Sequence, residues 1–151
     1  AYGINPAGPR VPRIRSMSMN NWVGGPSWSS SGNGWKVYTK DSDMTAPGPS
    51  QTFVLIDERE DSINDGYFVV DMQGFPDRGA SWKIVDYPAS YHNGAATFAF
   101  ADGHSEIHRW TNPRTIPSLS KSNIPLNVPS PNNEDVLWMQ ERSTRLINAV
   151  R

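Results

Sequence analysis

The stretch from Ala95 to Trp110 reads AATFAFADGHSEIHRW, two runs of alternating residues on either side of Asp102-Gly103. An Asp-Gly pair suits the positive-φ positions of a two-residue type I′ turn, so the stretch predicts a β-hairpin. With that loop, the face assigned to the core carries Phe98, Phe100 and Ile107. The opposite, polar face carries Thr97, Ala99, Ala101, His104, Glu106 and His108.

Other strand patterns lie on the N-terminal side of this hairpin. Thr52–Ile56 is the clearest, because it is continuous, apolar and partly β-branched. Four more strands are expected at Ile14–Asn20, Trp35–Thr39, Tyr67–Val70 and Ser81–Val85. Together these patterns predict an antiparallel sheet of about five to seven strands, joined by long loops.

One helix is expected at the C-terminal end, over residues 134–148. Asn132 or Asn133 can cap it, and Glu134 and Asp135 suit the positive end of its dipole. Its apolar face is predicted to carry Val136, Met139, Leu146, Ile147 and Val150. The fold class is therefore α+β, a globular sheet domain with one C-terminal helix.

The organisation of the chain follows from its loops. Residues 1–13 are rich in Pro and Gly and are expected to form an extended N-terminal segment, with a single globular domain over residues 14–151. Residues 111–133 are rich in Pro, Asn and Ser and form a long arm. We expect a processed or truncated N-terminus, because residue 1 is not Met and the first residues resemble a loop.

Composition limits the classes of function. The formal net charge of the 151 residues is −1 and no basic stripe is present, which argues against nucleic acid as a partner. The chain has no cysteine, so disulfides and thiolate metal sites are excluded. These residues also contain no apolar run long enough to span a membrane.

A second pattern starts before the hairpin. His92 is followed, after nine intervening residues, by Asp102 and Gly103. This H-x9-DG spacing resembles the signature of bacterial prepilin-type, pseudopilin-like proteins of planctomycetes and verrucomicrobia. Three further stretches resemble the same family in the expected order, namely Arg15–Asn20, Thr52–Gly66 and Asp135–Ser143.

The resemblance implies a structural role rather than catalysis. It predicts a subunit of an extracellular or periplasmic pilus- or pseudopilus-like filament, exported to the cell surface, whose partners are copies of itself. Family members begin with a leader and a long apolar helix, and membrane contact is expected only through such a helix, which these residues do not include. The extended segments 1–13 and 111–133 are the expected intersubunit elements.

An acidic loop follows the clearest strand. Clustered hard oxygen ligands can hold Ca²⁺, and the resemblance implies a structural calcium, so a site is predicted at Asp57, Asp61, Asn64 and Asp65. The spacing is not that of an EF-hand, since position 3 from Asp61 is Ile63. The alternative is a solvated loop in which Asp61 and Asn64 cap turns. Calcium is the one cofactor expected.

Histidines supply a second candidate metal set. His104, Glu106 and His108 alternate along one strand, and two His with a carboxylate is a zinc-like combination. The favoured interpretation is instead the polar, solvent-facing side of the hairpin. For His92, Asp102 and Gly103 a structural role is favoured, with Gly103 at a positive-φ position.

Catalytic patterns are missing from the sequence. It has no cysteine nucleophile and no G-x-S-x-G motif, so the chain is not expected to be an enzyme. The alternative function is a secreted carbohydrate-binding module, with Trp22, Trp28 and Trp35 stacking on surface glycans. For these tryptophans, plugging the core is the favoured role.

Overall fold

The structure, a computed structural model, describes residues 2–3, 11–12, 16–26, 28, 34–120 and 122–148. Its strands are β1 (Tyr2–Gly3), β2 (Val11–Pro12), β3 (Met17–Asn20), β4 (Phe53–Asp57), β5 (Tyr67–Phe68), β6 (Lys83–Ile84), β7 (Ala95–Phe100), β8 (Ser105–Arg109) and β9 (Val128–Pro129). One α-helix, α1 (Glu134–Glu141), and short 3-10 helices at Asp41–Asp43, Pro49–Gln51 and Gly79–Ser81 complete the described elements.

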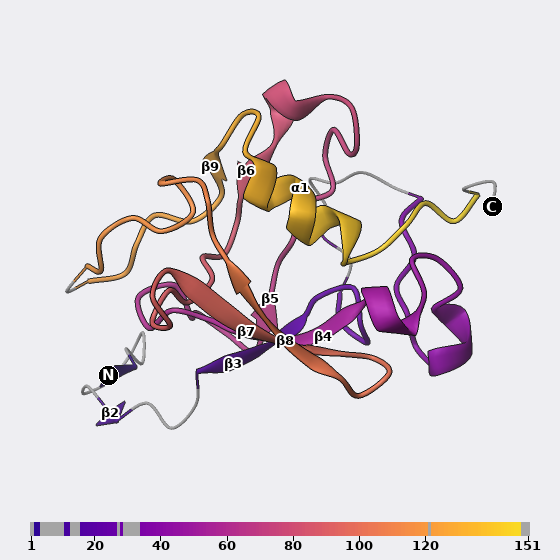
Figure 1. The fold of residues 1–151 in the computed structure, drawn as a ribbon, viewed down its shortest axis with the longest axis horizontal. Helices are drawn as coiled ribbons and strands as arrows, with labels where there is room; N and C mark the ends of the chain where they lie inside the picture. Colours follow the sequence, from indigo (N-terminus) through magenta and orange to yellow (C-terminus); the bar gives the residue numbers. More distant parts are fainter. Residues whose placement is uncertain are drawn as a thin grey trace.

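The main sheet has five strands in the order β5-β3-β4-β7-β8. Its pairings are antiparallel except that of β3 with β5, which is parallel, so the sheet is mixed rather than purely antiparallel. β6 and β9 form a separate two-stranded sheet, as do β1 and β2. Figure 1 shows α1, β6 and β9 on the same side of the main sheet. The predicted α+β class is confirmed.

A β-bulge in β4 brings two apolar residues to the covered face. The register shifts between Phe53 and Leu55, so Phe53 pairs with Phe100 and Ile56 with Phe98. An extra residue in one strand lets positions three apart share a face. Both Phe53 and Ile56 are consequently 0% exposed.

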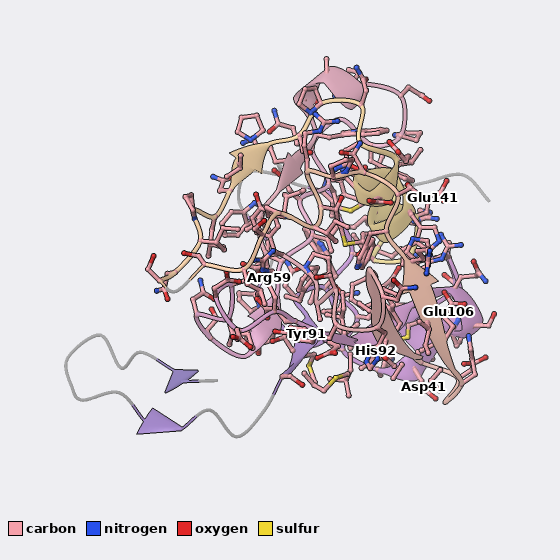
Figure 2. The ribbon with its side chains drawn as sticks, turned by 60° about the vertical axis from the view of Figure 1, so that its left-hand side comes forward. Asp41, Arg59, Tyr91, His92, Glu106 and Glu141 are labelled. Atoms are coloured by element: carbon pink, nitrogen blue, oxygen red, sulfur yellow. The ribbon has the colours of Figure 1, made fainter. Side chains whose placement is uncertain are left out.

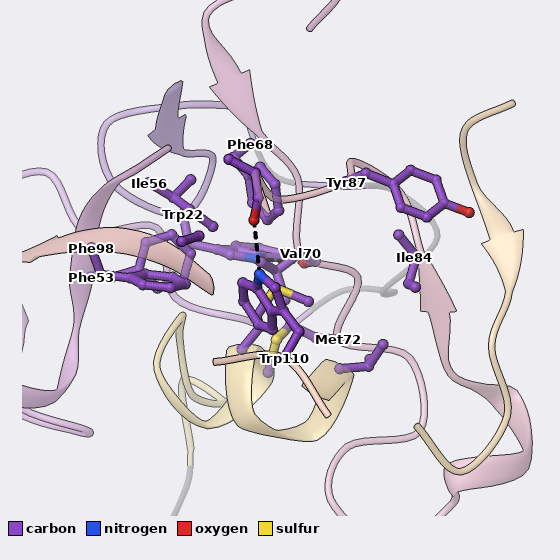
Figure 3. Close-up of a cluster of buried hydrophobic side chains, with 14 of the residues drawn as sticks. Trp22, Phe53, Ile56, Phe68, Val70, Met72, Ile84, Tyr87, Phe98 and Trp110 are labelled. Carbon is purple, nitrogen blue, oxygen red and sulfur yellow. Dashed lines mark hydrogen bonds between the residues drawn. The ribbon is translucent and has the colours of Figure 1, made fainter. Parts of the chain in front are cut away.

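Aromatic rings make up the centre of the core (Figure 3). The ring of Phe98 has its centroid 5.3 Å from that of Phe53 and 4.9 Å from that of Trp138, both edge-on. Trp22 is fully buried and donates its indole N–H to the carbonyl of Val70. Edge-to-face rings of this kind give a small, loop-rich domain a dense interior.

The hairpin was predicted in the right place but in the wrong register. Phe98 pairs with Glu106, and Thr97 with Ile107. The loop has three residues, Ala101–Gly103, because Gly103 donates to the carbonyl of Phe100 and Phe100 donates to that of His104. A one-residue change in register turns every β8 side chain over, so Ile107 is 67% exposed rather than buried.

The other strand predictions are confirmed in part. The strand expected from Ile14 is described only from Met17, and Tyr67–Val70 and Ser81–Val85 contract to two residues each. Trp35–Thr39 is not a sheet strand and forms only isolated bridges from Trp35 to Leu146 and from Tyr38 to Val23.

The C-terminal helix is shorter than predicted. Asn133 caps it by accepting the backbone N–H of Asp135, and Val136 and Met139 are buried as expected. Beyond Arg142 the hydroxyl of Ser143 bonds back to the carbonyl of Met139, and that of Thr144 bonds to Lys36. Hydroxyl side chains that bond to backbone groups compete with helix.

The remaining residues of the predicted helix face therefore lie outside the helix. Leu146 and Ile147 are 45% and 58% exposed. Val150 lies outside the described residues. Among the described residues, no helix combines the length and the apolar character needed to cross a bilayer.

Candidate functional site

The acidic loop after β4 is built around a buried arginine. Arg59 is 1% exposed and forms a bidentate pair with Asp61, with 2.8 Å between Nη2 and Oδ2. It also donates to the carbonyls of Pro117 and Ser118. Burial alone raises the pKa of Asp61, but the hydrogen bonds from Arg59 and the Ser120 N–H hold it below its usual value.

This pair joins the loop to the arm. The Ser120 N–H lies 2.7 Å from Asp61 Oδ2, and Ile124 donates to the Asp61 carbonyl. Thr115 and Ser130 in the same arm are 0% and 1% exposed. The arm over 111–133 thus packs against its own domain through these contacts. A contact between this arm and a neighbouring subunit stays a prediction. The intersubunit role of segment 1–13 also stays a prediction, and most of that segment lies outside the described residues.

Two further carboxyl groups are buried without a cationic partner in the described structure. Glu58 is 0% exposed and accepts the Ser62 hydroxyl at 3.0 Å, while its Oε2 has no hydrogen-bond partner there. Asp86 is 3% exposed and accepts the Val69 N–H at 2.6 Å. Burial, with repulsion from Asp86, raises the pKa of Glu58 to about 8. Burial likewise raises the pKa of Asp86 to about 7.

Three of the four predicted calcium ligands make contacts with separate partners. Asp61 is engaged by Arg59, Asp57 Oδ2 lies 4.0 Å from His92 Nε2, and Asp65 accepts the Tyr67 N–H. Asn64 is exposed. In the part of the chain that the structure describes, no three His, Asp or Glu side chains converge as metal ligands. The side chains in this arrangement do not form one calcium site, and binding stays a prediction for calorimetry to test.

The H-x9-DG residues stand at the two ends of β7. His92 precedes the strand and faces Asp57 at the end of β4. Asp102 and Gly103 form the hairpin tip, where Gly103 has φ 93°. Hydrogen bonds from the side chain and backbone N–H of His104 lower the pKa of Asp102. The spacing therefore matches the length of one central strand plus its turns.

His104, Glu106 and His108 do share a face, but it is the face of the core. The imidazole of His104 stacks on Phe100 with centroids 4.4 Å apart, and that of His108 stacks on Trp138 at 3.7 Å. The predicted solvent-facing position is therefore wrong for His108, because the register places it beside α1. Burial lowers the pKa of His108.

The loop tryptophans face inward. Trp22 is fully buried, and Trp28 and Trp35 pack against the core as partly buried residues. Trp35 meets Phe75 edge-on at 6.1 Å. Trp22 therefore has no free face for a sugar ring, while carbohydrate binding through Trp28 or Trp35 stays a prediction.

Sequence reasoning missed Arg59, Glu58 and Asp86 as buried groups. The one available signal was that Arg59 is the single basic residue in the acidic run 57–65, where a carboxylate partner is close in sequence. Its carbonyl partners at Pro117 and Ser118 lie too far along the chain to be inferred.

Comparisons of the chain with known protein families, with curated proteins and with solved structures found no match.

Proposed function

We propose that this domain is a structural subunit of an extracellular or periplasmic pilus- or pseudopilus-like filament, whose partners are copies of itself. The H-x9-DG pattern and the three ordered stretches support this proposal through their resemblance to prepilin-type proteins. In such a subunit the residues of the motif stabilise the domain, and catalysis is not required of them.

One structural observation supports the proposal most strongly, namely the uneven covering of the main sheet. On the covered side, Phe53, Phe98 and Phe100 are at most 4% exposed. The opposite side carries Met17, Met19 and Leu55, all partly exposed, and the 67% exposed Ile107. Met19 pairs with Leu55 across β3 and β4, whereas Ile107 lies two strands away on β8. Apolar residues on an exposed face are typical of a contact with another chain segment.

The positions of the motif residues are consistent with a framework role. His92 and Asp102 lie at opposite ends of β7, where His92 Nε2 is 4.0 Å from Asp57 Oδ2 and Asp102 contacts the His104 imidazole. β7 is hydrogen-bonded on both sides, to β4 and to β8. Because β7 holds β4 and β8 together, contacts that define its two ends also stabilise the sheet that carries the uncovered face.

Immunogold electron microscopy of the producing cells tests this function, with antibodies raised against this chain. We expect gold particles along filaments outside the inner membrane, and no such labelling in cells from which the gene is deleted. Labelling confined to the cytoplasm, with no labelled filament, would contradict the proposal.

A further inference from the structure

The outer edge of β8 is open. β8 is the last strand of the main sheet, and none of the described residues pairs with its far side. Four of its five residues are exposed, with Ile107 at the centre of the strand. Figure 2 shows Glu106 at the rim of the molecule, far from the interior position of Arg59. An open edge of this kind is a template for another strand.

The hydrogen bonds of the hairpin show which backbone groups point outward. Phe100 donates to His104 and Trp110 donates to Gly94, so His104 and Trp110 face β7. Direction alternates along an antiparallel strand. Glu106 and His108 therefore also turn their N–H and C=O groups toward β7, whereas Ser105, Ile107 and Arg109 direct theirs away from the sheet.

The side chains of β8 complement a second β8 that runs the opposite way. With Ile107 placed opposite its own copy, Glu106 lies opposite His108, and Ser105 lies opposite Arg109. Residues directly opposite one another share a face and interact. Each carboxylate thus meets an imidazole, and no like charges are opposed at these positions.

The imidazole in this pairing is already held in place. His108 stacks on Trp138 at 3.7 Å with 15° between the ring planes, and the Arg142 guanidinium lies 4.1 Å from the same ring centre. Two groups so close to one ring centre occupy opposite faces of Trp138. A side chain held in this way loses little rotamer freedom when it meets a partner.

We propose that two copies of this chain associate through antiparallel, two-fold pairing of β8 with β8, centred on Ile107. Three outward N–H groups from each copy provide about six backbone hydrogen bonds. The contact joins the two main sheets edge to edge. Because a two-fold contact is closed, it does not rest on the filament proposal and can form in the isolated domain.

Charged residues on an edge strand often serve to prevent self-association. That protection is strongest where like charges meet in the paired state. Glu106 and His108 are instead placed at positions that the two-fold axis brings into register. The matched sequence around Ile107 therefore favours a second copy of the chain as the occupant of this edge.

Sedimentation equilibrium of the chain over a wide range of concentrations tests the pairing. We expect a reversible monomer–dimer equilibrium. Ile107→Pro removes an N–H that points away from β7, so the hairpin keeps its own ladder. We expect this change to weaken the dimer by about tenfold or more, since one hydrogen bond is lost from each copy.

A lysine variant tests the same contact without the risk that proline disrupts the fold. Ile107→Lys places two ammonium groups opposite each other and should weaken the dimer in the same way. Leu119→Lys is the matched control, because Leu119 is an exposed residue of the arm, 51% accessible, and should leave dimerisation unchanged. Far-ultraviolet circular dichroism confirms that each variant is folded.

A charge exchange tests the register. Glu106→Lys removes the carboxylate that meets the His108 imidazole, and His108→Glu opposes two carboxylates, so each variant alone should dimerise poorly. Mixed together, the two variants place an ammonium group opposite a carboxylate on one side and restore the original Glu106–His108 pair on the other. We expect a heterodimer to form at least about tenfold more tightly than either homodimer.

Three results would overturn the inference: a wild-type chain that is monomeric at every concentration, a dimer unaffected by both Ile107 substitutions, or a variant mixture that forms no heterodimer. None of them bears on filaments in the producing cell. Failure of this inference is therefore distinguishable from failure of the proposed function.

Discussion

On the covered face of the main sheet, Phe53 and Phe98 are 0% exposed, while on the opposite face of the same sheet Ile107 is 67% exposed. Both faces are apolar in part, and both are formed by the same hydrogen-bonded ladder. The covered face is completed by α1 and the two-stranded sheet of β6 and β9, as Figure 1 shows. The uncovered face and the β8 edge have no comparable cover among the described residues.

The difference teaches that the effect of a substitution depends on which face of the sheet the side chain occupies, and this face alternates along β7. Neighbours such as Phe98 and Thr97 differ by one position and face opposite sides. Substitutions on the covered face should change the stability of the monomer. Substitutions on the uncovered face or the open edge should change association and leave monomer stability nearly unaltered.

The largest effect is expected on the covered face, from Phe98→Ala. Phe98 is fully buried among Phe53, Trp110 and Trp138. Truncation leaves a cavity and should lower the free energy of unfolding by about 4 kcal/mol. Urea denaturation measures the loss. Ile107→Ala is the control, expected to change monomer stability by less than about 0.5 kcal/mol. Equal losses for both would refute the contrast between the faces.

Arg59→Ala should have the next largest effect. It leaves the carboxylate of Asp61 buried without its cation and removes the donors to Pro117 and Ser118. Breaking a buried pair from one side costs about 3 kcal/mol. The exposed Arg109→Ala is the control. We expect limited proteolysis to cut the arm faster in the Arg59 variant only. An arm as resistant as in the wild type would show that Arg59 does not hold it.

Glu58 should make stability fall as pH rises. Its folded pKa of about 8 exceeds the ordinary value of 4.5, so its stabilising contribution is complete below 4.5 and is lost as pH rises through 8. Asp86, raised to about 7, adds in the same direction. Glu58→Gln should stabilise the domain by several kcal/mol at alkaline pH, since the pKa rises from 4.5 to about 8 and each pKa unit is worth about 1.4 kcal/mol.

Urea denaturation in acidic and alkaline buffers checks this pH dependence. The exposed Asp77→Asn is the matched control and should keep the wild-type slope of stability against pH. A Glu58 variant with the wild-type slope would show that Glu58 is already ionised in the folded protein.

Gly103→Ala should have a smaller effect on the monomer than Phe98→Ala, Arg59→Ala or Glu58→Gln. Gly103 has φ 93°, and no atom lies within 4 Å of an added Cβ, so the cost is backbone strain alone. A loss of about 1 kcal/mol is expected from placing alanine at positive φ, and thermal unfolding measures it. Gly25, whose φ is not in that region, serves as contrast, because its added Cβ would meet the Asn21 carbonyl at 2.6 Å. If the Gly103→Ala variant were as stable as the wild type, the positive φ would not explain why glycine occupies this position.

Local patterns predicted much of the fold. The apolar run at β4, the hairpin around Asp102-Gly103 and the helix cap at Asn133 were all correctly placed. The hairpin register was not, because Asp-Gly fits both a two-residue loop and the observed three-residue loop with Gly103 at positive φ. That single ambiguity reversed the positions predicted for Ile107 and His108.

The contacts of the candidate sites depended on long-range packing. Arg59 reaches carbonyls 58 and 59 residues away, and Trp138 meets His108 only because α1 crosses the covered face. The local periodicity of the sequence does not predict these long-range contacts. The contact of His92 with Asp57 likewise joins the start of β7 to the end of β4.

Amide hydrogen exchange followed by NMR at low and high protein concentration tests most directly whether the sheet continues beyond β8. The account predicts that the amides of Ser105, Ile107 and Arg109 become protected only at high concentration, whereas those of Glu106 and His108 are protected at both. Rapid exchange of the Ile107 amide at every concentration would contradict it.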